Sequence, residues 1–157
     1  MKSPHEASNS PLTPMIREEK LHIPYSPNAP EEIQCVLLVE DDPALKRYLE
    51  VVLQRAGYIV ITASDGLEAM KFLLEMEVDL IVTDALMPNL DGYELCRFVR
   101  NSSHLVHLPI ILLSALDPKN STDESEQVDA FLAKPVSPEE FLSRIEKVLA
   151  TKMHKMH

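Results

Sequence analysis

The stretch that decides the fold class is Val78-Asp-Leu-Ile-Val-Thr-Asp-Ala-Leu-Met-Pro-Asn-Leu-Asp-Gly92. Its apolar run, Leu80 to Val82, is too short for a helix and apolar enough for a strand buried on both faces of a parallel sheet. The run stops at Asp84, and a loop proline and an Asp-Gly turn follow. Open α/β sheets place their chemistry at the carboxyl ends of such strands, so Asp84 is a candidate reactive residue. A solvated acidic strand end would explain this stretch alone equally well.

Length, composition and charge limit the classes of protein that this sequence can encode. With 157 residues and 45% apolar content, the chain suits one folded domain with its own core. Its net charge of −10 argues against direct nucleic-acid binding, which needs clustered basic residues. No apolar run approaches the ~18 residues of a membrane helix, and the amino terminus lacks a signal-peptide layout. We therefore expect a cytoplasmic protein that contacts neither membranes nor nucleic acid.

The first 32 residues differ in composition from the rest of the chain. They hold six of the twelve prolines and show no sustained apolar periodicity, so they cannot bury enough surface to offset the entropy of ordering. We predict a flexible leader over residues 1–32, with partner docking as its less favoured role, a folded domain over residues 33–152 and a tail over residues 153–157. Within the domain, Cys35 and Cys96 lie among apolar neighbours, which favours buried thiols over a disulfide or a metal pair.

From Gln34 onward, short apolar runs alternate with amphipathic stretches, which is typical of βαβ units and a parallel sheet. The predicted strands are Cys35–Val39, Tyr58–Thr62, Leu80–Thr83, Ile110–Leu113 and Ala130–Ala133. The first predicted helix has Asp42 as its N-cap and Pro43 in its first turn, and Gly57 ends it. Further helices are predicted from Gly66 to about residue 76, from about residue 91 to 100, and after a capping box at Ser137.

Polar side chains follow four of the predicted strands at the point where each strand ends. They are Glu40, Asp41 and Asp42 after the first strand, Asp84 after the third, Ser114 after the fourth, and Lys134 before Pro135 after the fifth. The carboxyl ends of parallel strands share one edge, so these side chains converge on a single pocket. Crowded carboxylates repel unless a cation lies among them, and an all-oxygen cluster favours Mg²⁺ over zinc. The sequence therefore predicts a metal site at this edge.

Each of these residues has a simpler explanation when it is taken alone. Asp42 caps the following helix, Ser114 bonds its own backbone, and Lys134 is a solvated lysine before a proline. We favour the cap for Asp42. For the others, the joint occurrence of acids, a hydroxyl and an amine at successive strand ends favours a shared site.

Four stretches resemble the receiver domain of two-component response regulators. They are Val39-Glu-Asp-Asp-Pro43, Asp84-Ala-Leu-Met-Pro-Asn-Leu-Asp-Gly92, Ser114-Ala115 and Phe131-Leu-Ala-Lys-Pro135. Their order and spacing agree with the family from about Gln34 to Ala150. The resemblance implies a flavodoxin-like α/β fold, with a doubly wound five-stranded parallel sheet in the strand order 2-1-3-4-5 and helices on both faces.

The resemblance also implies a function and a role for each residue. Asp84 would accept a phosphoryl group from the phosphohistidine of a sensor histidine kinase or a histidine phosphotransfer protein. The protein ligands of Mg²⁺ would be Glu40 through water, Asp41, Asp84 and the main-chain carbonyl of Leu86. Lys134 would pair with the phosphoryl group, and Ser114 and Phe131 would form the switch. The chain would then be a phosphoacceptor signalling domain rather than an enzyme.

Two features depart from the family pattern. The stretch from Asp117 to Gln127 has no large apolar residue where the family has an amphipathic helix, and no glycine precedes the fifth strand. We expect Leu116–Val128 to be the least stable part of the domain and the part most altered by phosphorylation. The chain also ends at His157, soon after the last predicted helix, so we expect output through contact with an unknown protein target. A fragment of a longer regulator stays an alternative.

Other classes of protein explain the strand-end residues less well. A haloacid-dehalogenase-type phosphatase needs a second acid two residues after its nucleophile, where this chain has Leu86. An FMN carrier needs a phosphate loop after the first strand, and Glu40 to Asp42 would repel a phosphate there. A receiver fold used as a constitutive interaction module would not need the complete set of site residues. The spacing of His104 and His107, and of His154 and His157, would suit a metal, but solvated side chains explain them better.

Overall fold

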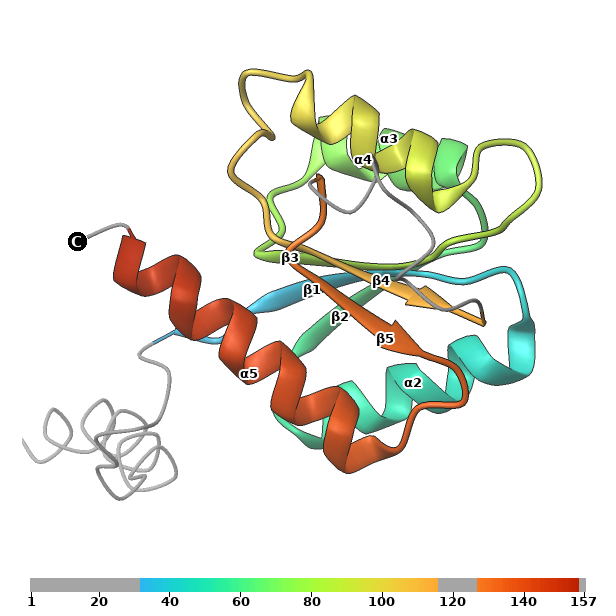
Figure 1. The fold of residues 1–157 in the computed structure, drawn as a ribbon, viewed down its shortest axis with the longest axis vertical. Helices are drawn as coiled ribbons and strands as arrows, with labels where there is room; N and C mark the ends of the chain where they lie inside the picture. The colour runs from blue at the N-terminus through green and yellow to red at the C-terminus, as the bar shows by residue number, and fades with distance from the viewer. Residues whose placement is uncertain (1–31, 116–126, 156–157) are drawn as a thin grey trace, which may run out of the picture. The chain divides into compact units, whose positions relative to one another are not determined.

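The computed structural model describes residues 32–115 and 127–155 (Figure 1). Residues 1–31 of the predicted leader (1–32), residues 116–126 of the predicted unstable segment (116–128), the side chain of His154 and the whole of His157 lie outside these described residues. The strands are β1 (Cys35–Val39), β2 (Ile59–Ala63), β3 (Leu80–Asp84), β4 (Ile110–Ser114) and β5 (Ala130–Ala133). The helices are α2 (Pro43–Arg55), α3 (Gly66–Glu75), α4 (Gly92–Arg100) and α5 (Pro138–Lys155).

The five strands form one parallel sheet in the order β2-β1-β3-β4-β5, which confirms the predicted fold class and strand order. Strand β2 lies one residue later than predicted, and β3 and β4 each run one residue further. These two strands continue because Asp84 pairs in register with Leu113, and Ser114 with Ala133. The reactive candidates Asp84 and Ser114 are therefore the last residues of their strands.

Helices cover both faces of the sheet, with α2 and α5 on one face and α3 and α4 on the other (Figure 1). Alternate residues of the strands point into these two apolar cores. All five residues of β3 and all five of β4 are buried, as expected for central strands of a parallel sheet. This double covering makes the ends of the strands the natural place for a ligand to reach the sheet.

The helix caps follow the predicted chemistry. The Asp42 carboxylate accepts from the Ala44 N–H at 3.0 Å at the start of α2, and the Ser137 hydroxyl accepts from the Glu140 N–H at 3.1 Å at the start of α5. Helix α5 continues through Lys155, into the segment predicted as a tail. Of the helices in the described ranges, none combines the length and the hydrophobicity needed to cross a membrane.

Candidate functional site

The carboxyl edge of the sheet collects the strand-end residues that the sequence singled out. Glu40 and Asp41 follow β1, Asp84 ends β3, Ser114 ends β4 and Lys134 follows β5. Backbone bonds past the strand ends keep these segments in register: the Glu40 N–H donates to the Ala63 carbonyl, and the Lys134 N–H donates to the Ser114 carbonyl, at 3.0 and 2.9 Å. The backbone hydrogen bonds of the parallel sheet therefore position the site residues.

Lys134 joins the two buried carboxylates of this edge. Its Nζ donates to Glu40 Oε1 at 2.9 Å and lies 3.0 Å from Asp84 Oδ2. Glu40 is 0% exposed and Asp84 is 8% exposed, whereas 22% of the Lys134 side chain reaches solvent. Two carboxylates at this depth need a compensating cation, because an unpaired buried charge is costly. Lys134 supplies half of that compensation, which leaves one negative charge in the cluster before Asp41 is counted.

The pKa values of Glu40 and Lys134 reflect the opposing effects of burial and of their interaction with each other. Burial raises the pKa of Glu40, although hydrogen bonds from Lys134 and from the Asp42 N–H act in the opposite direction. For Lys134, burial alone would lower the pKa, but the hydrogen bonds and charges of Glu40 and Asp84 outweigh it, and the pKa is raised. Lys134 is therefore a firmly protonated cation at the centre of the site.

Glu40, Asp41 and Asp84 form a group that fits a hard divalent cation. One carboxylate oxygen from each lies within 4.8 Å of the others. Oxygen-only ligands at this spacing suit Mg²⁺, which binds through a few carboxylates and keeps several waters. Asp41 is exposed while its two neighbours are buried, so a cation would have solvent on one side. Among the side chains described for residues 32–115 and 127–152, no other group of three acidic, histidine or cysteine residues meets this spacing, so His104 and His107 form no such site with them.

Asp42 lies outside this group, as the sequence predicted. Its carboxylate is engaged by the Ala44 N–H as the cap of α2, and its own N–H donates to Glu40 Oε2 at 3.1 Å. Asp42 thus orients Glu40 through its backbone while its side chain faces the helix. Asp41 is thus a candidate metal ligand, whereas the next residue, Asp42, is the N-cap of α2.

The loop after Asp84 is fastened to the start of α3, a feature that the sequence reasoning missed. The Asn89 amide donates to Asp65 Oδ2 at 2.8 Å, and the Gly66 N–H donates to the Leu90 carbonyl at 3.0 Å. Asn89 has φ of 69°, in the left-handed region that asparagine tolerates. At Gly92, a Cβ atom would collide with the Asp84 carbonyl. These contacts fix the path of the loop beside the phosphoacceptor candidate; an asparagine in a Pro-Asn turn was the available signal.

The switch candidates lie beside this site but differ in burial. Ser114 is 5% exposed at the end of β4. Phe131 is half-buried in β5 and packs against the core under α3 and α4. The side chain of Leu86, whose main-chain carbonyl is the remaining ligand candidate, is 61% exposed. Both cysteines are free thiols. Cys96 is buried, as predicted, and burial raises its pKa to about 12, whereas Cys35, the first residue of β1, is only half-buried and so corrects the prediction.

The comparison with known families identifies this arrangement. The model of the response regulator receiver domain matches residues 36–146. The chain is 39% identical over 123 residues to the transcriptional regulatory protein GltR of Pseudomonas aeruginosa, an alignment that covers 74% of this chain and 49% of GltR. The chain therefore spans about half the length of that curated relative.

Solved structures show the same fold. The chemotaxis response regulator CheY4 of Vibrio cholerae superimposes with a TM-score of 0.71 at 31% identity, covering 74% of this chain and 99% of that chain. The receiver domain of a sensor histidine kinase from Pseudomonas aeruginosa was solved with a magnesium ion coordinated in its active site cleft. It superimposes with a TM-score of 0.69 at 30% identity, covering 76% of this chain and 99% of that chain.

Proposed function

Because the chain belongs to the family of response regulator receiver domains, we propose that Asp84 accepts a phosphoryl group from a phosphohistidine. The donor would be a sensor histidine kinase or a histidine phosphotransfer protein. The observation that carries this proposal is the placement of the Asp84 carboxylate, 3.0 Å from the Lys134 ammonium and within a cluster that fits a divalent cation. Phosphoryl transfer depends mainly on positioning and on fixed positive charge, which is what this edge offers.

Each residue has a defined part in the transfer. An Asp84 carboxylate oxygen attacks phosphorus in line with the P–N bond of the donor, which breaks and leaves the electron pair on the imidazole nitrogen. Lys134, which bridges Asp84 and Glu40 before the reaction, moves its charge onto a phosphoryl oxygen. We assign the metal ligands to Glu40 through water, Asp41, Asp84 and the main-chain carbonyl of Leu86. Bound Mg²⁺ would neutralise negative charge on the phosphoryl oxygens.

The acyl phosphate would then act on the switch residues. It adds roughly two negative charges and strong acceptor oxygens at the end of β3. The Ser114 hydroxyl, at the end of the adjacent strand, would donate a hydrogen bond to it and draw the following loop inward. Phe131 pairs in register with Leu112 of β4 and is only half-buried, so it has room to move into the space that the loop vacates.

We propose that the signal leaves by protein–protein contact and that the chain acts in the cytoplasm as a signalling domain. The folded unit would cover residues 33–152. A net charge of −10 supports a protein target over nucleic acid. A second candidate is a receiver that works within a longer transcriptional regulator, since the chain spans about half of GltR. The two candidates share the same phosphoryl chemistry and differ in the target.

The direct test is phosphorylation with a small-molecule donor. The protein is incubated with Mg²⁺ and acetyl phosphate, and the phosphoryl adduct is followed by intact-protein mass spectrometry. We expect an adduct on the wild type and on Asp42→Asn, because Asp42 faces α2 and asparagine caps a helix equally well. Asp84→Asn should show none. A wild-type protein that never gains the adduct would support a constitutive interaction module, and an adduct on Asp84→Asn at the wild-type rate would move the acceptor elsewhere.

A further inference from the structure

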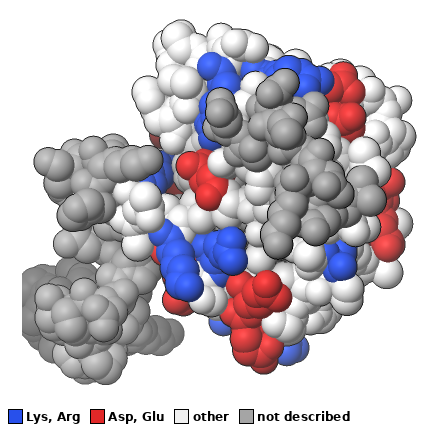
Figure 2. Space-filling model, viewed as in Figure 1, with Lys and Arg blue, Asp and Glu red and all other residues white. Residues whose placement is uncertain are grey.

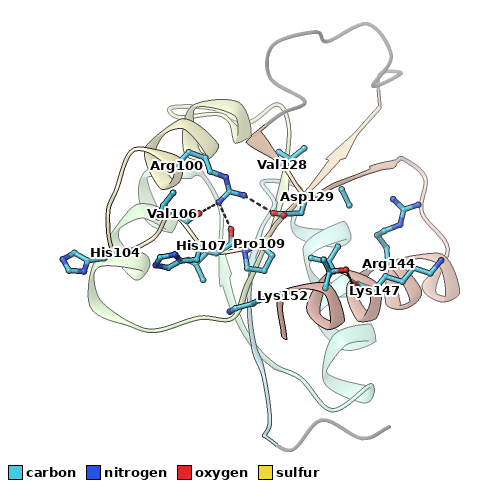
Figure 3. A pocket seen from close by; sticks show the side chains of 14 residues that line it. Arg100, His104, Val106, His107, Pro109, Val128, Asp129, Arg144, Lys147 and Lys152 are labelled. Atoms are coloured by element: carbon cyan, nitrogen blue, oxygen red, sulfur yellow. Dashed lines mark hydrogen bonds and ion pairs between the residues drawn. The ribbon is translucent and has the colours of Figure 1, made fainter. Parts of the chain in front are cut away.

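A second concave site lies at the opposite edge of the sheet, where β4 and β5 begin (Figure 3). It has a volume of about 980 Å³. Its lining comes from the end of α4, the loop before β4, the start of β5 and helix α5. The apolar part of the lining is made by Val106, Leu108, Pro109, Val128, Ala130 and Val148. We call this site the amino-edge pocket.

The amino-edge pocket is positively charged, although the chain as a whole carries −10. Helix α5 contributes Arg144, Lys147 and Lys152 from its last three turns, and Figure 2 shows blue side chains over the middle of this helix. Among the described residues of the lining, Asp129 is the single carboxylate, and it is bound by Arg100 Nη2 at 3.0 Å and by the Ile110 N–H at 2.8 Å. The part of the lining that the structure describes therefore holds no second carboxylate for the α5 cations.

Arg100 connects the segments that surround the amino-edge pocket by hydrogen bonds. Its guanidinium donates to the carbonyls of Val106 and Leu108 at 3.0 and 2.7 Å and to the Asp129 carboxylate (Figure 3). It also donates to the Gln127 carbonyl at 2.9 Å. One side chain thus holds the loop before β4 and the residues before β5 in fixed positions. Val106 is left 41% exposed on the pocket wall by this arrangement.

The charges that remain for a ligand are on α5. Lys147 is exposed, and among the described residues its ammonium group has no hydrogen-bond or ion-pair partner. Within the described part of the chain, Lys152 donates to the Asp79 carbonyl alone, at 3.3 Å, which leaves two of its protons for other acceptors. Thr151 lies one turn from Lys147 and is also exposed. An acidic group that lies along this face of α5 would meet cations without displacing an existing ion pair.

We propose that the amino-edge pocket docks an acidic, amphipathic segment of a partner protein, and that it does so whether or not Asp84 is phosphorylated. Aliphatic side chains of the segment would cover the apolar lining, and its carboxylates would bind Lys147 and Lys152. The mixed lining favours a peptide over a polyanion such as DNA, which a chain of net charge −10 repels. Because the pocket and Asp84 lie at opposite ends of the parallel strands, docking leaves the phosphoryl site open. This surface goes beyond the proposed phosphoryl acceptance.

The test is fluorescence anisotropy of labelled probes with the full chain at low salt. The probes are a twelve-residue helical peptide of glutamate and leucine, its lysine–leucine counterpart, a glutamate–serine peptide without aliphatic groups, and a twelve-nucleotide single-stranded DNA. We expect only the glutamate–leucine peptide to bind, with affinity that falls as salt rises. Equal binding of the glutamate–serine peptide or of the DNA would overturn the proposal, because the apolar lining would then have no part in recognition.

Variants locate the binding on the molecule. Lys147→Glu combined with Thr151→Glu should weaken peptide binding by about tenfold or more, the effect of reversing one rim charge and adding another. Val106→Asp should weaken it independently, through the apolar wall. Lys71→Glu on α3 is the matched control, since Lys71 is exposed and does not line the pocket, and it should bind like the wild type. Equal losses in the control would place the binding elsewhere. Acetyl phosphate should modify all these variants as it modifies the wild type. If the wild type is not modified, the proposed phosphoacceptor function is wrong, and the proposed docking site is unaffected.

Discussion

The two edges of the sheet are built in opposite ways. At the carboxyl edge, Glu40 and Asp84 are almost fully buried and share one lysine, so the site is acidic and its charges are paired. At the amino edge, Arg100 binds the one carboxylate found among the described lining residues, and the α5 cations that line the pocket are half-buried or exposed. A parallel sheet collects the ends of its strands at two separate places, so one chain presents two chemically different sites. The contrast predicts that charge pairing contributes much more to stability at the buried carboxyl edge than at the amino edge.

The largest expected effect is a loss of stability when the lysine of the carboxyl edge is removed, and removal of a lysine at the amino edge is its comparison. Lys134→Met keeps the apolar stem but leaves Glu40 and Asp84 without their cation. We expect the free energy of unfolding at pH 7 to fall by about 3 kcal/mol, as when one partner of a buried pair is removed. Lys147→Met at the amino edge should change it by less than about 0.5 kcal/mol, like other exposed substitutions. Urea unfolding of the two variants measures both values, and similar losses would contradict the contrast between the edges.

The sequence predicted the carboxyl edge far better than the amino edge. Asp84, Ser114 and Lys134 come directly after apolar runs, and the parallel register carries such residues to one place, so local pattern was sufficient. Asp42 was also placed correctly, because Pro43 marks the first turn of a helix and so identifies its cap.

The amino edge depends on contacts that no local pattern encodes. Arg100 and Asp129 are 29 positions apart, and each is an ordinary charged residue near the end of an element. The tie between Asn89 and Asp65 is of the same kind, since it spans 24 positions. His104 and His107 were considered only as a spacing for metals, whereas they line a pocket whose walls come from four separate segments. Periodicity predicts elements and their ends; it does not predict which side chains meet across them.

A smaller effect separates neighbouring carboxylates within the carboxyl edge. Asp41→Asn should weaken Mg²⁺ binding by about tenfold or more, equivalent to at least about 1.4 kcal/mol, because its oxygen belongs to the cluster with Glu40 and Asp84. Asp42→Asn should change the affinity by less than about twofold, since this carboxylate caps α2. Isothermal titration calorimetry with MgCl₂ compares the variants directly. A greater loss for Asp42→Asn would mean that the acidic pair is displaced by one residue along the chain.

The smallest expected effect is the contribution of Glu40 to the pH dependence of stability. It tests whether burial of the charged Glu40 carboxylate destabilises the folded protein. Burial raises the pKa of Glu40 above its usual 4.5, although Lys134 and the Asp42 N–H oppose this by hydrogen bonding. Between the usual value and the raised value, the folded protein therefore holds a proton on Glu40 that the unfolded chain has released. Stability from this group is fully present below about pH 4.5 and is lost as pH rises through the folded pKa.

This contribution can be isolated by comparing the wild type with Glu40→Gln, which keeps the size of the side chain and removes its titration. Other carboxylates act with the opposite sign, since backbone and Asn89 hydrogen bonds lower the pKa of Asp65, so the difference between the two proteins is the informative quantity. From pH 7 down to 4.5, the stability of the wild type should improve relative to that of the variant, as measured by urea unfolding in a metal-free buffer. Saturating Mg²⁺ should reduce or reverse the trend, because a cation in the cluster favours the charged form of Glu40. If the difference in free energy of unfolding between the two proteins stays constant across this range, Lys134 alone compensates for the burial of Glu40. The buried carboxylate would then destabilise the carboxyl edge no more than exposed charges destabilise the amino edge.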